Sequence, residues 1–189
     1  MKKRTVIVGA IVLFFSTSLL FQSCNKIKDL VAFDVNKPLP TQKFEIDSAS
    51  ASAKGDILLY ESSFYINLDS ILAANDISAA KISDSKFKKI LLSIVNPSAT
   101  RQFGFVSHLS IKLSTNDQFD NAELIASASN IKPGDSTLTF KMENIQLDKY
   151  IEQSTFYYRL YGSIISPVPV TKLAVEMQSA VQFTVKPLK

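Results

Sequence analysis

His108, the single histidine of the chain, is the side chain best suited to acid–base chemistry, and Ser107 and Ser110 stand close to it in sequence. A histidine between a serine and an acid would form an acyl-transfer site. The alternation of apolar and polar residues over 109–113, however, turns His108 away from the predicted core, and the sequence has no Gly-x-Ser-x-Gly motif. We therefore expect a surface histidine and no catalytic residues.

Residues 116–121 gather oxygen-bearing side chains of the kind that calcium prefers. This segment lacks the glycine and the closing glutamate of an EF-hand loop, so we interpret it as a turn. The five glycines of the chain form no phosphate-binding motif. The sequence thus predicts neither a metal site nor a cofactor.

Cys24 is the only cysteine, which excludes an intramolecular disulfide. It follows a positively charged start at residues 1–4 and an uncharged apolar segment at 6–21, with the small residue Ser23 just before it. This order of parts is typical of a secretory signal. A membrane-spanning helix is the alternative, but 16 residues rise only about 24 Å as a helix, less than the ~30 Å hydrocarbon core of a bilayer. The segment is therefore predicted to be an export signal.

The run Leu20-Phe21-Gln22-Ser23-Cys24 resembles the lipobox of bacterial lipoprotein precursors, with Cys24 as the lipid acceptor. The resemblance implies cleavage before Cys24 and a diacylglycerol thioether on its sulfur, usually with a third acyl chain. Two or three acyl chains make membrane attachment effectively permanent. By the same resemblance, Asn25 replaces the aspartate that retains some Gram-negative lipoproteins in the inner membrane, which favours the outer membrane. Residues 25–28 also lack the acidic run of some surface-exported lipoproteins, which favours the periplasmic face. The alternative is an ordinary secretory signal followed by an incidental thiol.

The expected organisation is a signal peptide at residues 1–23, a lipidated tether at 24–29 and one domain at 30–189. A domain of this size buries roughly two-thirds of its unfolded surface, so it needs no disulfide. No low-complexity linker divides it. A single folded unit close to its anchor is therefore predicted.

Charge argues against nucleic acid as a partner. Removing the signal takes away three basic residues and no acidic one, so the formal net charge falls from +4 to about +1. Proteins that bind nucleic acid usually show a basic stripe. The densest basic cluster here, Lys86, Lys88 and Lys89, is interpreted as a solvated strand face or edge.

The domain is predicted to consist of β-strands, because apolar residues recur at every second position in most segments. About eight strands, with turn-rich connections and no alternating helices, predict an all-β fold: an antiparallel β-sandwich of immunoglobulin-like or jelly-roll topology. The predicted strand segments are 31–35, 43–48, 57–66, 86–95, 109–113, 123–127, 138–142, 156–160, 173–177 and 181–185.

Two similar heptapeptides, residues 66–72 and 145–151, interrupt the β pattern. In both, apolar residues at i, i+3 and i+4 predict one or two helical turns with an apolar face. One hypothesis is an internal repeat that presents Asp69 and Asp148 as a pair of ligands. The hypothesis that we favour is two short helices that cap the open ends of the sandwich, with each aspartate in a first turn near the helix dipole.

Tyr157 and Tyr161 are predicted on the outer face of one strand, because Phe156, Tyr158 and Leu160 share its other face. Outward tyrosines suit a protein or sugar surface, since each offers a flat apolar ring with a polar tip. Cross-strand packing is the alternative.

These features together predict a non-enzymatic cell-envelope lipoprotein, held at the membrane through lipid on Cys24, whose β-sandwich is a binding or assembly module for protein partners. The alternative function is a carrier of lipid or another apolar ligand in a pocket between the sheets. An envelope hydrolase would require a nucleophile, a base and an acid that converge.

Overall fold

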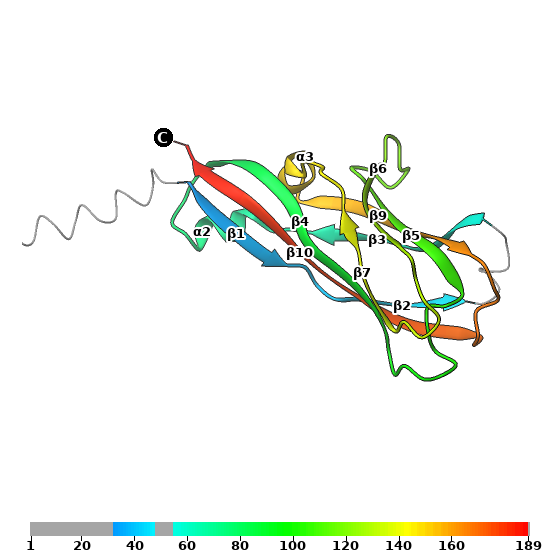
Figure 1. The fold of residues 1–189 in the computed structure, drawn as a ribbon. Coiled ribbons are helices and arrows are strands. Elements are labelled where there is room, and N and C mark those ends of the chain that lie inside the picture. Colours follow the sequence, from blue (N-terminus) through cyan, green and yellow to red (C-terminus); the bar gives the residue numbers. More distant parts are fainter. Residues whose placement is uncertain (1–31, 48–54, 189) are drawn as a thin grey trace, which may run out of the picture.

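The computed structural model describes residues 32–47 and 55–188, which form a two-layered β-sandwich with two short helices (Figure 1). The predicted all-β sandwich is thereby confirmed. Cys24, the predicted signal peptide and the predicted tether lie outside the described residues. Within the described ranges, no helix is long and apolar enough to cross a membrane.

The described residues form ten strands and two helices. The strands are β1 Phe33–Pro38, β2 Gln42–Asp47, β3 Gly55–Tyr65, β4 Ala80–Ile94, β5 Val106–Ser114, β6 Glu123–Ser129, β7 Thr137–Thr139, β8 Lys141–Met142, β9 Thr155–Ile164 and β10 Lys172–Pro187. The helices are α2 Leu68–Ala73 and α3 Asp148–Glu152.

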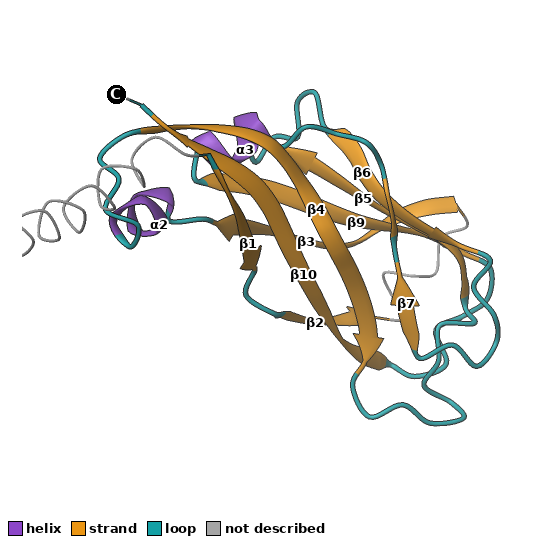
Figure 2. Ribbon diagram, turned by 60° about the vertical axis from the view of Figure 1, so that its left-hand side comes forward, coloured by secondary structure: helices purple, strands orange, loops and turns teal. Residues whose placement is uncertain are grey.

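The order of the strands identifies the sandwich as a jelly roll. One sheet has the order β1-β10-β4-β7, with β2 also paired to β10, and the other has the order β3-β9-β5-β6-β8 (Figure 2). When β1 and β2 are counted as one interrupted strand and the two-residue β8 is set aside, consecutive strands alternate between the sheets except at the β5–β6 hairpin. An immunoglobulin-like sandwich instead keeps its strands A and B side by side in one sheet, and its strands F and G side by side in the other.

Alternation of side chains explains how the longest strands form. Every second residue of β9 is buried, and β10 keeps the same pattern across almost all of its 16 residues. The segments predicted at 173–177 and 181–185 are therefore one strand, because their apolar positions share one phase. β4 begins at Ala80, earlier than predicted, since β10 continues beside it as far as Pro187.

The prediction of one strand at 138–142 is wrong, because the structure has two short strands there, one in each sheet. Leu138 of β7 pairs with Leu92 of β4, whereas Met142 of β8 pairs with Ala126 of β6. Between them Phe140 is buried, and its backbone N–H donates to the carbonyl of Ile90 at 3.1 Å. Alternation distinguishes inside from outside, but it cannot tell which sheet a strand joins.

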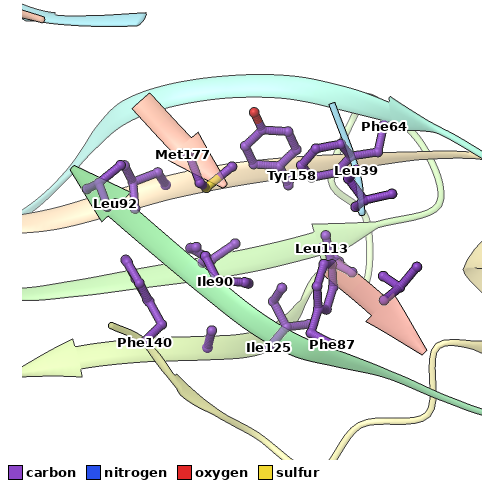
Figure 3. Close-up of a cluster of buried hydrophobic side chains, with 14 of the residues drawn as sticks. Leu39, Phe64, Phe87, Ile90, Leu92, Leu113, Ile125, Phe140, Tyr158 and Met177 are labelled. Carbon is purple, nitrogen blue, oxygen red and sulfur yellow. The ribbon is translucent and has the colours of Figure 1, made fainter. Parts of the chain in front are cut away.

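Aliphatic and aromatic side chains from both sheets fill the interior (Figure 3). Phe140, Phe156, Tyr158 and Phe183 are at most 4% exposed, as their predicted inner positions require. Rings also contact one another: Phe64 stacks on Tyr158 with centroids 4.6 Å apart. Full burial of a large apolar side chain contributes about 1.5–3 kcal/mol. This packed layer is what keeps the two outer faces rigid.

Both predicted helical segments are helical, and both lie at the same end of the sandwich (Figure 1). They share an end because β3 and β9 are neighbours, and the N–H of Ile66 donates to the carbonyl of Ser154 at 2.7 Å. The N-cap of α2 is Asn67, whose side chain accepts from the N–H of Ser70. α3 has no side-chain cap; Asp148 instead accepts from the N–H of Ser85 in β4 at 3.0 Å.

The same end holds the start of β1 and the C-terminal residues. Phe33 pairs with Val185, and the N–H of Leu188 donates to the carbonyl of Ala79 at 2.9 Å. Loops 95–105, 130–136 and 165–171 meet at the opposite end, where the N–H of Phe103 donates to the carbonyl of Asp135 at 2.7 Å. The chain therefore enters the domain at the helical end.

Candidate binding surface

Aromatic and basic side chains gather on the outer face of the sheet β3-β9-β5-β6-β8. Tyr157, Arg159 and Tyr161 are half-buried on β9, between the fully buried residues of the inner face. The predicted outward position of the two tyrosines is confirmed. We call Tyr157, Arg159 and Tyr161, together with Leu58, Glu61, Lys112 and Phe119, the aromatic face.

Arg159 is the centre of this surface. Its Nε donates to Glu61 Oε2 of β3 at 2.7 Å, and its Cζ lies 3.9 Å from the centroid of the Phe119 ring. The hydrogen bond that Arg159 donates to Glu61 raises the pKa of the Arg159 guanidinium above its ordinary value. A guanidinium stacked on a ring and bonded to a carboxylate is held in one orientation. The Arg159 side chain is thus held in place by contacts within the domain.

Phe119 reaches Arg159 because the β5–β6 loop folds back over the sheet. Its backbone has φ of 59°, in the left-handed region. The loop is held by its own polar groups, since Asn116 Oδ1 accepts from the N–H of Asp120 at 3.3 Å and from Ser114 Oγ at the same distance. The oxygen-rich segment 116–121 is therefore a turn, as predicted. Across the described ranges, no group of three or more His, Cys, Asp or Glu side chains is placed to hold a metal ion.

Tyr161 extends the surface along β9. The Nζ of Lys112 lies 5.3 Å from the centroid of its ring. On one side, Tyr161 pairs with Leu58 of β3, which is 42% exposed. On the other side, Tyr161 pairs with Ser110 of β5, which is buried. An exposed leucine, a ring and a cation thus lie next to one another on adjacent strands.

His108 lies on β5 at the edge of this surface, half-buried, opposite Ser163 of β9 in the ladder. Ser163 Oγ donates to the carboxylate of Asp56 on β3, and Ser107 Oγ donates to the Ser163 carbonyl at 3.3 Å. An acyl-transfer triad needs the histidine between the serine and the acid. Here the serine lies between them, so the row Asp56–Ser163–His108 does not match that arrangement.

The hydrogen bonds around Glu123 join α3 to β6. Tyr150 OH donates to Glu123 Oε2 at 2.7 Å, and Lys149 Nζ lies 2.8 Å from the same oxygen. The hydrogen bond from Lys149, and to a smaller extent that from Tyr150, lowers the pKa of Glu123. Burial, and to a smaller extent the hydrogen bond to Glu123, raises the pKa of Tyr150.

The aspartates of the two similar heptapeptides do not lie together in one site. Asp69 is exposed on α2. The two aspartates of the similar heptapeptides therefore have different surroundings, as Asp148 bonds to β4.

Two hollows lie elsewhere on the described part of the chain. One, of about 240 Å³, lies where β1 passes into β2 and includes Leu39, Lys89 and Ser179. The other, of about 210 Å³, lies among the loops at the end far from the helices. There a Cβ on Gly104 would lie 3.0 Å from the Cα of Pro133, so these loops are tightly packed. Both hollows are smaller than the 300–1,000 Å³ usual for ligand pockets.

Sequence reasoning identified the two outward tyrosines but missed Arg159, Glu61 and Phe119. Arg159 is 98 residues from Glu61 along the chain, and only the strand register brings them together. The available signal was a lone arginine between two tyrosines on a strand. Lys86, Lys88 and Lys89 are exposed on β4, as the interpretation of a solvated face or edge requires.

No protein-family model and no curated protein matches this chain.

Proposed function

We propose that this chain is a cell-envelope lipoprotein that binds a protein partner through the aromatic face and performs no catalysis itself. In this proposal acyl chains on Cys24 hold it in the outer membrane, and the domain faces the periplasm. The lipobox-like run ending at Cys24 supports the anchor. The partner would be another component of the envelope.

The observation that carries the binding part is the fixed cluster of Arg159, Phe119 and Tyr161. Arginine and tyrosine are enriched among the residues that dominate the energy of protein interfaces. Here they are half exposed, yet Glu61 and Lys112 already restrict their motion. Side chains fixed in advance lose little conformational entropy on binding, which favours affinity.

The packed interior supports a protein partner over an apolar ligand held between the sheets. Phe156, Tyr158 and Phe183 are at most 1% exposed and occupy the space that such a ligand would need. Sheets in a sandwich lie about 10 Å apart, so a bound lipid would have to displace these rings. We therefore rank the carrier second.

Native mass spectrometry of the protein extracted from its own membrane tests the proposal. We expect a mass increment of acyl chains that is lost in Cys24→Ala, and a co-purifying protein that is lost in the double variant Tyr161→Ala, Arg159→Ala. The matched control is the double variant Lys172→Ala, Glu45→Ala, which removes an exposed cross-strand pair of the other sheet. A stoichiometric small lipid in place of a protein would favour the carrier.

A further inference from the structure

Five exposed lysines gather on the outer face of the sheet β1-β10-β4-β7. Lys81, Lys86, Lys88 and Lys89 lie on β4, and Lys186 lies beside them on β10. We call the outward residues of 81–89, 182–186 and 34–36 the lysine face. These three segments contain five lysines and two acidic residues, Asp34 and Asp84, which gives a net charge of three. The mature chain as a whole has a net charge of only about +1.

The acidic side chains of this face do not neutralise most of the lysines. Lys186 Nζ lies 3.8 Å from Asp84 Oδ2, and both side chains are more than half exposed. Asp34 instead accepts from Gln182 at 3.1 Å and from Thr184 at 2.7 Å. In the described part of the chain, Lys81, Lys86, Lys88 and Lys89 make no ion pair.

Two of the lysines repel each other in the folded protein. Lys81 and Lys186 are direct partners in the β4–β10 ladder. Like charges directly opposite on neighbouring strands are destabilising. Blunting of a sheet edge accounts for lysines at 86–89, because β4 pairs with β7 only at Leu91–Ser93. Lys81 lies on the same free edge of β4, but Lys186 lies on β10 between β1 and β4, where edge blunting does not apply. An external anion would relieve the repulsion between Lys81 and Lys186 that the exposed Asp84, 3.8 Å from Lys186 Nζ, leaves.

The position of the face relative to the proposed anchor indicates which anion this is. β1, β10 and β4 lie side by side (Figure 1), and Phe33 at the start of β1 pairs with Val185, the neighbour of Lys186. Seven residues lie between Cys24 and Ala32, the first described residue, so the eight steps from one Cα to the next span at most about 28 Å even when fully extended. A lipid on Cys24 would therefore keep this face within reach of the membrane surface.

We propose that the lysine face lies against anionic lipid headgroups of the membrane that holds the anchor, so that the aromatic face on the opposite sheet points away from it. This inference rests on the lipid anchor of the proposed function. A basic patch adds a second, electrostatic attachment to the acyl chains. It also fixes an orientation, which acyl chains attached at a single residue do not.

Quenching of single labels in reconstituted vesicles tests the orientation. Because acylation consumes Cys24, an introduced cysteine is the only free thiol of the full lipidated protein. Asn36→Cys places a fluorophore on the lysine face, and Ser63→Cys places one on the opposite sheet; both positions are exposed. The vesicles are pure phosphatidylcholine, or phosphatidylcholine with one part in three phosphatidylglycerol, and both contain a lipid with a quencher on its headgroup.

We expect the label at position 36 to be quenched more than the label at 63 in the anionic vesicles, and the difference to disappear in phosphatidylcholine or at high salt. Each lysine removed should reduce the oriented population about fivefold, the equivalent of about 1 kcal/mol. The triple variant Lys86→Gln, Lys88→Gln, Lys89→Gln should therefore abolish the difference. The control triple Lys132→Gln, Lys141→Gln, Lys172→Gln, which lies outside both the lysine face and the aromatic face, should retain it.

Flotation of the vesicles separates failure of the orientation from failure of the anchor. Protein that floats with both vesicle types but shows equal quenching at positions 36 and 63 would overturn the orientation and leave the anchor standing. Protein that does not float with phosphatidylcholine vesicles would overturn the anchor, and this inference with it. Equal quenching is also the outcome if the lysine face serves an acidic protein.

Discussion

Among single residues, Tyr150 best illustrates how a polar group stabilises an apolar element. Its ring is 1% exposed, while its hydroxyl reaches Glu123, which also bonds to Lys149. Burial of the ring stabilises α3 on the sandwich, and the hydrogen bond determines where on β6 the helix sits. A buried hydroxyl without such a partner would be costly.

Tyr150→Phe should destabilise the fold by about 1 kcal/mol at neutral pH, because it removes a hydrogen bond to a carboxylate that stays partly solvated. Denaturant melts of the variant and the original protein measure this difference.

Glu123 should make the stability of the fold depend on pH. Because the pKa of Glu123 is lowered in the folded state, its contribution to the free energy of unfolding is complete above the unfolded pKa near 4.5 and is lost as pH falls below it. Glu123→Gln should therefore flatten the acid limb of a stability–pH curve measured by denaturant melts. Tyr157→Phe is the control. An acid limb unchanged by Glu123→Gln would contradict this account.

At the scale of elements, the periodicity of side chains predicted most strands, because each buries one face. The segments at 57–66 and 156–160 correspond to β3 and β9 for this reason. Periodicity does not carry register or sheet membership, which depend on contacts between distant residues. The split of 138–142 into β7 and β8, and the contact of Arg159 with Phe119, are consequences of that long-range order. This is why the tyrosines of the aromatic face were predictable and its centre was not.

The burial of the two helices leads to a prediction at this scale. Leu147 and Ile151 around α3 are at most 2% exposed, so truncation of either to Ala should cost about 2–5 kcal/mol. Leu68 and Ile71 of α2 are only partly buried, and their truncation should cost roughly 1–2 kcal/mol, in proportion to the smaller apolar area.

The aspartates of the helices provide the control for these truncations. Asp69→Asn should have little effect, because Asp69 is exposed on α2. Asp148→Asn should also have little effect, because an amide oxygen still accepts from the N–H of Ser85. Denaturant melts in which the aspartate variants prove costlier than Leu147→Ala would point to a shared polar site at this end of the sandwich.

At the scale of the whole molecule, the two outer faces of the sandwich differ in chemistry. The sheet with β10 presents unpaired lysines, and the sheet with β9 presents aromatic rings and a fixed arginine. The start of β1 at the helical end connects the first of these sheets with the proposed anchor. A packed interior holds the faces in a constant relation, so that orientation at the membrane also orients the surface offered to a partner.

The same interior leads to the last prediction. Native-density packing of Phe140, Phe156, Tyr158 and Phe183 leaves no room for a lipid chain, whereas a carrier needs an apolar pocket of some 300–1,000 Å³. The domain from Asn25 onward should therefore show no saturable one-to-one binding of an apolar fluorescent probe at neutral pH. One-to-one binding of the probe that is lost in a folded Phe140→Asp variant would contradict this prediction. Such binding would require the sheets to separate in solution, and it would replace the protein-binding module with the carrier.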